Sequence, residues 1–142
     1  MCGIFAYLSN DENVDRETLK HNGMKSRHRG PDKTNEVCIQ TKNNFNYFLF
    51  HRLSINGLNE KSDQPMKLNG NDNHVLLCNG EIYNYRELAQ EYNINLETDS
   101  DCEIILHLYK LSRVSEFIKK LDGVFSFLIY DKLTHQVIVG HD

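Results

Sequence analysis

The spacing of apolar and polar residues divides the chain into strands, then helices, then strands again. Short apolar or β-branched runs predict strands, whereas apolar residues three and four positions apart predict helices. The chain therefore mixes both kinds of element in separate blocks. Strands are expected over 2–8, 36–41, 45–53, 74–78, 124–130 and 136–140, and helices over 15–27, 81–92, 101–111 and 114–121.

Turn-forming residues set the limits of these elements. Asn22-Gly23 weakens the first helix, and Gly30-Pro31 makes the stretch RHRGPDK (27–33) a loop. Residues 54–73 are polar and read as a long loop. Segregated strands and helices favour an α+β domain with antiparallel sheets over an alternating fold. The last predicted strand is expected to lie at a sheet edge, or the chain is a piece of a larger protein.

Composition narrows the class of protein. The chain has 142 residues, 39% of them hydrophobic and 25% charged, as expected for one globular domain. A net charge of −4 argues against a nucleic-acid partner. We find no apolar run long enough to span a membrane and no secretory signal, so we expect a cytoplasmic protein with no membrane partner.

The four cysteines lack the paired spacing of zinc sites, and no histidine stands at metal-ligand spacing, so no metal is predicted. In a reducing compartment we expect free thiols. Cys38, Cys78 and Cys102 lie in apolar stretches and read as small buried hydrophobes. Cys2 differs because it follows the initiator methionine.

Removal of Met1 would give Cys2 both a thiol and a free α-amine. An α-amine has a pKa of about 7.7–8.0, which suits a general base near neutral pH. A single residue would then supply a nucleophile and its base. The alternative is that Cys2 is buried strand filler.

The stretch HVLLCNGEIYNY offers a partner for such a nucleophile. Asn79-Gly80 is also typical of a type I′ hairpin turn. The helical spacing after it instead predicts a link from a strand to a helix. There the Asn79 side-chain amide and the Gly80 N–H would point at a developing oxyanion.

Charged residues provide candidate substrate anchors. Arg52 ends an apolar strand, where a guanidinium can grip a carboxylate with two hydrogen bonds; the alternative is a surface arginine. Asp101 and Glu81 are candidates to bind an ammonium group. Asp101 alternatively only complements a helix dipole, because Ser100 and Glu103 form a capping-box pattern. Together these anchors suit an α-amino acid.

Seven motifs occur in an order that resembles a known family: MCGIFAYLS, RHRGPD, HRLSI, QP, NGEIYNY, SDCEIIL and LDGVFSFLIYD. The chain resembles the N-terminal glutamine amidotransferase type-2 domain of glutamine-hydrolysing asparagine synthetase. This is the class II, N-terminal-nucleophile (Ntn) hydrolase type. The resemblance covers residues 1–142 and implies a four-layer αββα sandwich.

The resemblance also implies roles for individual residues. Cys2 would attack the glutamine side-chain amide through a thioester, releasing ammonia and then glutamate. Asn79 and Gly80 would form the oxyanion hole, and Glu81 and Asp101 would bind the substrate ammonium group. Arg52 would hold the substrate carboxylate, and the pocket would be lined by Arg52, Leu53, Ser54, Ile55 and Asn56.

The chain also departs from the family's pattern. Family members run past Asp142 with further strands and a synthetase domain that uses ATP and Mg²⁺, and no SGGxDS loop for pyrophosphate occurs here. We therefore expect an incomplete domain that needs no cofactor and relies on a synthetase domain in cis or in trans. Asp99 replaces a glycine of the family, and His141 replaces an arginine.

Three kinds of function follow from these residues. The chain is an amidotransferase of asparagine biosynthesis or of another class II branch, a non-catalytic glutamine-binding or regulatory module, or an interaction domain with relic motifs. Glutamine is the expected small-molecule partner. A homodimer is compatible with all three functions.

Overall fold

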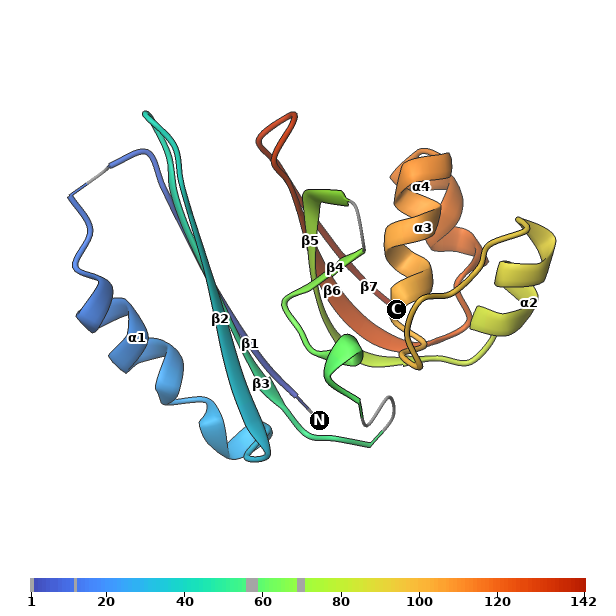
Figure 1. Cartoon of the computed structure of the whole chain (residues 1–142), viewed down its shortest axis with the longest axis horizontal. Helices are drawn as coiled ribbons and strands as arrows, with labels where there is room; N and C mark the ends of the chain where they lie inside the picture. Colours follow the sequence, from blue (N-terminus) through green and yellow to red (C-terminus); the bar gives the residue numbers. More distant parts are fainter. Residues whose placement is uncertain (1, 12, 56–58, 69–70) are drawn as a thin grey trace. The chain divides into compact units, whose positions relative to one another are not determined.

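The computed structural model describes residues 2–11, 13–55, 59–68 and 71–142. Its chain forms two units, Met1–Ser54 and Ile55–Asp142. Each unit contains one antiparallel sheet with helical segments (Figure 1). Two antiparallel sheets with separate helices confirm the α+β prediction.

Within its described residues, the first unit is a three-stranded sheet with one α-helix. Strands β1 (Gly3–Ser9), β3 (Phe45–Arg52) and β2 (Lys33–Gln40) lie in that order. Helix α1 (Arg16–Met24) covers one face of the sheet, and a 3₁₀ turn, Arg27–Arg29, follows it (Figure 1). The central strand β3 is buried along its whole length.

Helix α1 runs through Asn22-Gly23 and ends before the predicted residue 27. It begins at Asp15, whose carboxylate accepts a hydrogen bond from the Glu17 N–H at 3.0 Å. Gly23 fits here because an added Cβ would lie 3.2 Å from the Leu49 side chain. A residue that weakens the helix therefore lets it approach the sheet closely.

The second unit is a four-stranded sheet with three α-helices in its described residues. Its strands lie in the order β4-β5-β6-β7, so β7 is at the edge, as predicted. The strands are β4 (Met66–Leu68), β5 (Asn71–Ile82), β6 (Gly123–Asp131) and β7 (Gln136–His141). The helices are α2 (Tyr85–Glu91), α3 (Glu103–Leu111) and α4 (Val114–Phe117), with 3₁₀ turns at Glu60–Ser62 and Ile118–Lys120.

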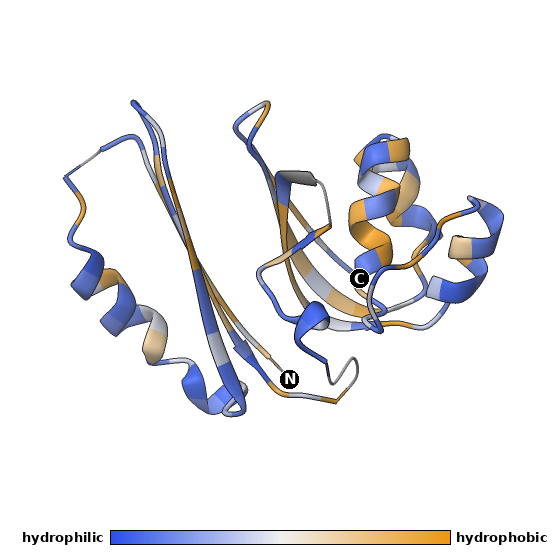
Figure 2. Cartoon of the chain, viewed as in Figure 1, coloured by the Kyte–Doolittle hydropathy of each residue, from blue (hydrophilic) through white to orange (hydrophobic). Residues whose placement is uncertain are grey.

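Helix α3 supplies much of this unit's core. Figure 2 shows that α3 is largely hydrophobic, whereas most of α1 is hydrophilic. Ile104, Ile105 and Leu108 have no exposed surface and pack with residues of β5 and β6. No helix in the described part of the chain has the length and hydrophobicity needed to cross a membrane.

The prediction that Asn79-Gly80 links a strand to a helix is wrong, because both residues lie within β5. The strand does not stop at Cys78 but continues to Ile82, and α2 begins only at Tyr85. Gly80 pairs with Phe125 across the ladder, and an added Cβ would lie 2.2 Å from the Val124 carbonyl oxygen. The prediction that Asn79-Gly80 does not form a hairpin turn is confirmed. The helical spacing of residues 81–92 was misleading at Ile82, because this residue reaches the hydrophobic core from a strand and not from a helix.

Four smaller predictions are also wrong. The 54–73 loop contains β4, the start of β5 and a 3₁₀ turn, and RHRGPDK contains a 3₁₀ turn. The predicted helix over 114–121 is one short α-helix followed by a 3₁₀ turn. The predicted capping box does not form, because the Glu103 carboxylate accepts hydrogen bonds from the N–H groups of Glu97 and Thr98 instead of that of Ser100.

Replacing Leu108 by alanine tests the importance of the α3 core. Leu108 has no exposed surface, so Leu108→Ala is expected to lower the free energy of unfolding by about 2–5 kcal/mol. Lys110→Ala, at an exposed position of the same helix, should change it by less than about 0.5 kcal/mol. Urea denaturation of both variants measures the difference, and equal losses would contradict this assignment of the core.

Candidate active site

Strand pairing places the Cys2 thiol at the end of β3. Gly3 pairs with His51, so Cys2 lies beside the residues that follow His51. The Leu53 N–H donates a hydrogen bond to Cys2 Sγ at 3.3 Å, and Sγ lies 3.7 Å from the Leu53 carbonyl oxygen. Cys2 is half-buried, so its sulfur is positioned by backbone contacts without being sealed in the core.

The RHRGPD motif holds both chain segments at this end of the sheet. Arg29 Nε donates to the Cys2 carbonyl oxygen at 3.0 Å. The Asp32 N–H donates to the Arg52 carbonyl oxygen at 3.1 Å, and the Asp32 carboxylate accepts from the Ser54 N–H at 2.7 Å. The motif therefore orients Cys2 and the Arg52–Ser54 segment together.

Gly30 allows the motif to approach β3 closely. An added Cβ would lie 2.2 Å from the His51 carbonyl oxygen and 2.7 Å from the Arg52 carbonyl carbon. His51 is fully buried, and its ring nitrogens lie 2.9 Å from the Gly23 carbonyl oxygen and 2.8 Å from Thr34 Oγ1. Its two ring nitrogens thus have partners within the unit.

In the second unit, β5 brings Asn79, Gly80 and Glu81 to the neighbourhood of Asp101. Asn79 is half-buried, and Gly80 and Glu81 are exposed. The Ile82 N–H donates to Asp101 Oδ2 at 2.6 Å. The loop before α3 is therefore fastened to β5 directly after the candidate oxyanion-binding residues.

Asp101 is a desolvated carboxylate. Only 7% of its surface is exposed, and this burial raises its pKa. The nearby negative charge of Glu81 raises that pKa further, whereas hydrogen bonds from the N–H groups of Ile82, Asp101 and Cys102 oppose the shift. Two carboxylates that repel each other form a favourable place for a cation.

Two further polar side chains hold the ends of this strand segment. The Gln64 side chain donates to the Cys78 carbonyl oxygen at 3.0 Å and accepts from the Cys78 N–H, just before Asn79. Asn84 donates to the Lys120 carbonyl oxygen at 2.8 Å and accepts from the Asp122 N–H at 3.0 Å. The motifs QP and NGEIYN contain these residues, but only the tertiary contacts reveal what they do.

Asp99 also has a defined contact. It is exposed, and its carboxylate accepts a hydrogen bond from the Asn59 side-chain amide. The Asp99 carboxylate therefore joins two loops of the second unit. Asp101 points to the Ile82 N–H, so the two carboxylates have separate hydrogen-bond partners.

The predicted site residues fall into two groups. Cys2, Arg52, Leu53 and Ser54 belong to the first unit, and Asn79, Gly80, Glu81 and Asp101 belong to the second. Ile55 begins the second unit and is 61% exposed. Asn56 and Met1 lie outside the described residues.

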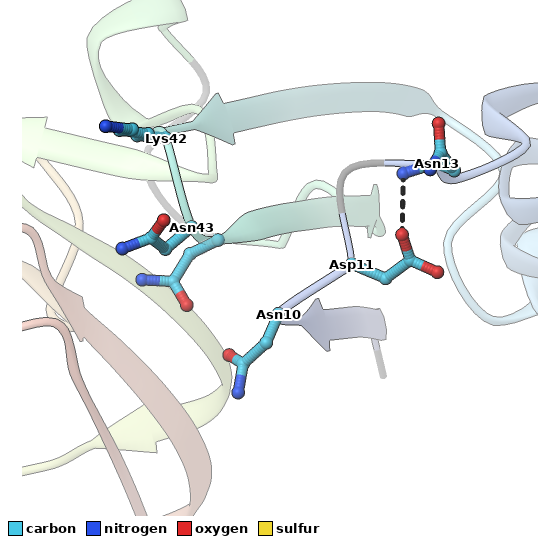
Figure 3. A pocket seen from close by; sticks show the side chains of 6 residues that line it. Asn10, Asp11, Asn13, Lys42 and Asn43 are labelled. Atoms are coloured by element: carbon cyan, nitrogen blue, oxygen red, sulfur yellow. Dashed lines mark hydrogen bonds between the residues drawn. The ribbon is translucent and has the colours of Figure 1, made fainter.

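A shallow polar pocket of about 550 Å³ lies at the opposite end of the first sheet (Figure 3). It is about 20 Å along β1 from Cys2, by the rise of seven strand residues. The Asn13 N–H donates to Asp11 there at 2.9 Å. Among the predicted site residues that the structure describes, none lines this pocket, which is formed by Asn10, Asp11, Asn13, Lys42, Asn43 and Asn44.

Comparison with known proteins identifies the class. Residues 1–142 match the glutamine amidotransferase domain family, and the chain belongs to that family. It is 36% identical over 146 residues to asparagine synthetase [glutamine-hydrolyzing] of Pongo abelii and 37% identical over 145 residues to that of Brassica oleracea. It is also 32% identical over 143 residues to a probable asparagine synthetase of Acanthamoeba polyphaga mimivirus.

Each of these alignments covers the whole chain but only 24–26% of the relative. The chain thus spans about a quarter of the length of these relatives. Their names describe glutamine-hydrolysing enzymes, and the shared domain is the glutamine amidotransferase.

Gly30→Ala tests the close approach that orients Cys2. The added methyl group would overlap the His51 carbonyl oxygen, so we expect the free energy of unfolding to fall by about 1–3 kcal/mol. Pro31→Ala, at the exposed next residue, is the control and should cost less than about 1 kcal/mol. Thermal unfolding compares the two, and a Gly30→Ala variant as stable as the parent would contradict the geometry.

Proposed function

We propose that the chain hydrolyses L-glutamine to glutamate and ammonia, with Cys2 as the nucleophile. The observation that carries the proposal is the half-buried Cys2 thiol, held on the Leu53 N–H beside Arg52. Membership of the glutamine amidotransferase family supports the choice of substrate.

The proposed reaction needs only groups of this domain and water. Once Met1 is removed, the Cys2 α-amine accepts the thiol proton, and the sulfur attacks the substrate's amide carbon. The resulting oxyanion accepts hydrogen bonds from the Asn79 amide and the Gly80 N–H. The α-ammonium returns its proton to the leaving nitrogen, so ammonia departs and a glutamyl thioester remains. Water then cleaves the thioester, which gives glutamate and restores the thiol.

Charge complementarity fixes the substrate class. Arg52 pairs with the glutamine α-carboxylate, and Glu81 and Asp101 together bind its α-ammonium group. Leu53, Ser54, Ile55 and Asn56 line the pocket in this proposal. An amide that lacks the α-carboxylate or the α-ammonium group would lose one of these charge pairings and should bind more weakly.

The proposal extends to the setting of the domain. The proposed fold of the domain is the four-layer αββα sandwich of N-terminal-nucleophile hydrolases. The ammonia would serve a synthetase domain, in cis or in trans, that uses ATP and Mg²⁺ to convert aspartate to asparagine. The relatives' names support this acceptor. A non-catalytic glutamine-binding module keeps the same anchors and would bind glutamine without turnover.

Cys2→Ala tests the nucleophile. Without the thiol no thioester forms, so we expect glutaminase activity to fall at least 10³-fold, because covalent catalysis is lost. A glutamine-analogue diazoketone should label the parent and leave Cys2→Ala unlabelled. Mass spectrometry measures both the label and the loss of Met1.

Cys38→Ala is the matched control, because Cys38 is a half-buried thiol on β2 with no role in the proposed reaction. It should keep its label and its activity. Labelling that persists in Cys2→Ala, or an intact Met1 in active protein, would refute the mechanism.

Asp101→Asn separates substrate binding from stability. Burial raises the pKa of Asp101, so the ionised carboxylate opposes folding. The contribution of the protonated Asp101 to the free energy of unfolding is fully present below its unfolded pKa, and it is lost as the pH rises through the higher folded pKa. At pH 7 the neutral side chain should therefore leave the free energy of unfolding unchanged or higher. The same change should raise the KM for glutamine at least tenfold.

Asp99→Asn, at the exposed neighbouring carboxylate, is the control. It should change the KM for glutamine by less than about threefold, because exposed charges are screened. Steady-state kinetics and urea denaturation at pH 7 provide both readouts. Equal KM values in Asp101→Asn and the parent would remove Asp101 from the substrate site.

A further inference from the structure

Glu103 is a fully buried carboxylate that the proposed reaction does not use. It lies in the first turn of α3 with no exposed surface. A buried charge is costly unless hydrogen bonds satisfy it. Burial alone would raise the pKa of Glu103, but hydrogen bonds from His107, from Thr98 and from the backbone outweigh it and lower the pKa. The carboxylate is therefore ionised at neutral pH.

Most of its hydrogen bonds go to one loop. Oε1 accepts from the Glu97 N–H at 2.7 Å, and Oε2 accepts from the Thr98 N–H at 2.7 Å and the Thr98 hydroxyl at 2.6 Å. Only the fourth bond, from His107 Nε2 at 2.8 Å, lies within α3 itself. Glu103 therefore fastens the loop to the helix more than it stabilises the helix.

The fastening extends to the residue before Asp101. The Ser100 N–H donates to the Thr98 hydroxyl oxygen at 3.1 Å, so the hydroxyl that Glu103 holds also holds Ser100. Asp101 follows at once and accepts from the Ile82 N–H. The direction of the Asp101 carboxylate is thus set by a loop that Glu103 ties down at two consecutive residues.

We propose that Glu103 is a positioning residue for the substrate ammonium site: its three hydrogen bonds to Glu97 and Thr98 fix the loop before Asp101 and thereby aim the Asp101 carboxylate at the α-ammonium of the substrate. This inference rests on the proposed function. It assigns specificity for the amino group to a side chain that does not touch the substrate. A purely structural Glu103 would affect every substrate equally.

Two substrates distinguish these roles in Glu103→Gln. Glutamine carries the α-ammonium, whereas glutaramic acid has the same chain, amide and carboxylate without it. In Glu103→Gln an amide NH₂ faces N–H donors, so the loop loses hydrogen bonds. We expect kcat/KM for glutamine to fall at least tenfold, mainly through KM, and kcat/KM for glutaramic acid to change less than threefold.

His107→Gln is the matched control, because it alters the one hydrogen bond that does not reach the loop. It should leave the ratio of the two substrates unchanged. Thr98→Val removes the shared hydroxyl and should lower kcat/KM for glutamine about fivefold, whereas Thr98→Ser should restore it. These Thr98 variants also decide the question if Glu103→Gln fails to fold. Equal losses for both substrates would overturn the proposal.

Hydrogen exchange makes the test independent of catalysis. The amides of residues 97–102 and of Ile82 should exchange at least tenfold faster in Glu103→Gln than in the parent, and at the parent's rate in His107→Gln. A parent chain that hydrolyses neither substrate would refute the proposed function. Unchanged exchange in Glu103→Gln would refute the positioning role, whatever the activity.

Discussion

The hydrogen bond from the Leu53 N–H to the Cys2 thiol is the contact on which the candidate chemistry depends. A residue at the start of a chain has little to hold it, and termini are commonly poorly ordered. Here the β1–β3 ladder fixes Gly3 opposite His51, and the Arg29 side chain holds the Cys2 carbonyl group. The Cys2 residue, proposed as the nucleophile, is therefore fixed by backbone pairing on one side and by the Arg29 side chain on the other.

Close backbone approach is the second constraint, and glycine meets it in both units. Gly30 lies against the His51 carbonyl group, and Gly80 lies against the Val124 carbonyl group. At each position any side chain would displace a strand that carries candidate site residues. The glycines of RHRGPD and NGEIYN therefore allow neighbouring backbone segments to approach closely.

Asp101 and Glu103 are neighbouring buried carboxylates whose pKa values shift in opposite directions. Glu103 receives hydrogen bonds from side chains and backbone, which lower its pKa, whereas burial and the charge of Glu81 raise the pKa of Asp101. The charge of Glu103 stabilises the loop at Glu97 and Thr98. The charge of Asp101 weakens the fold but suits a cationic ligand.

The sequence by itself determined the strands at 2–8, 45–53 and 124–130, because their apolar runs are long and bounded by turn residues. It also determined the family, because the motifs stand in a fixed order, and it singled out Cys2 by its place in the chain. Only the tertiary structure showed that β5 continues through Asn79-Gly80, since the pairing of Gly80 with Phe125 is a contact between residues 45 positions apart. The roles of Arg29, Gln64 and Glu103 were likewise hidden, because their partners are backbone groups whose positions no local pattern specifies.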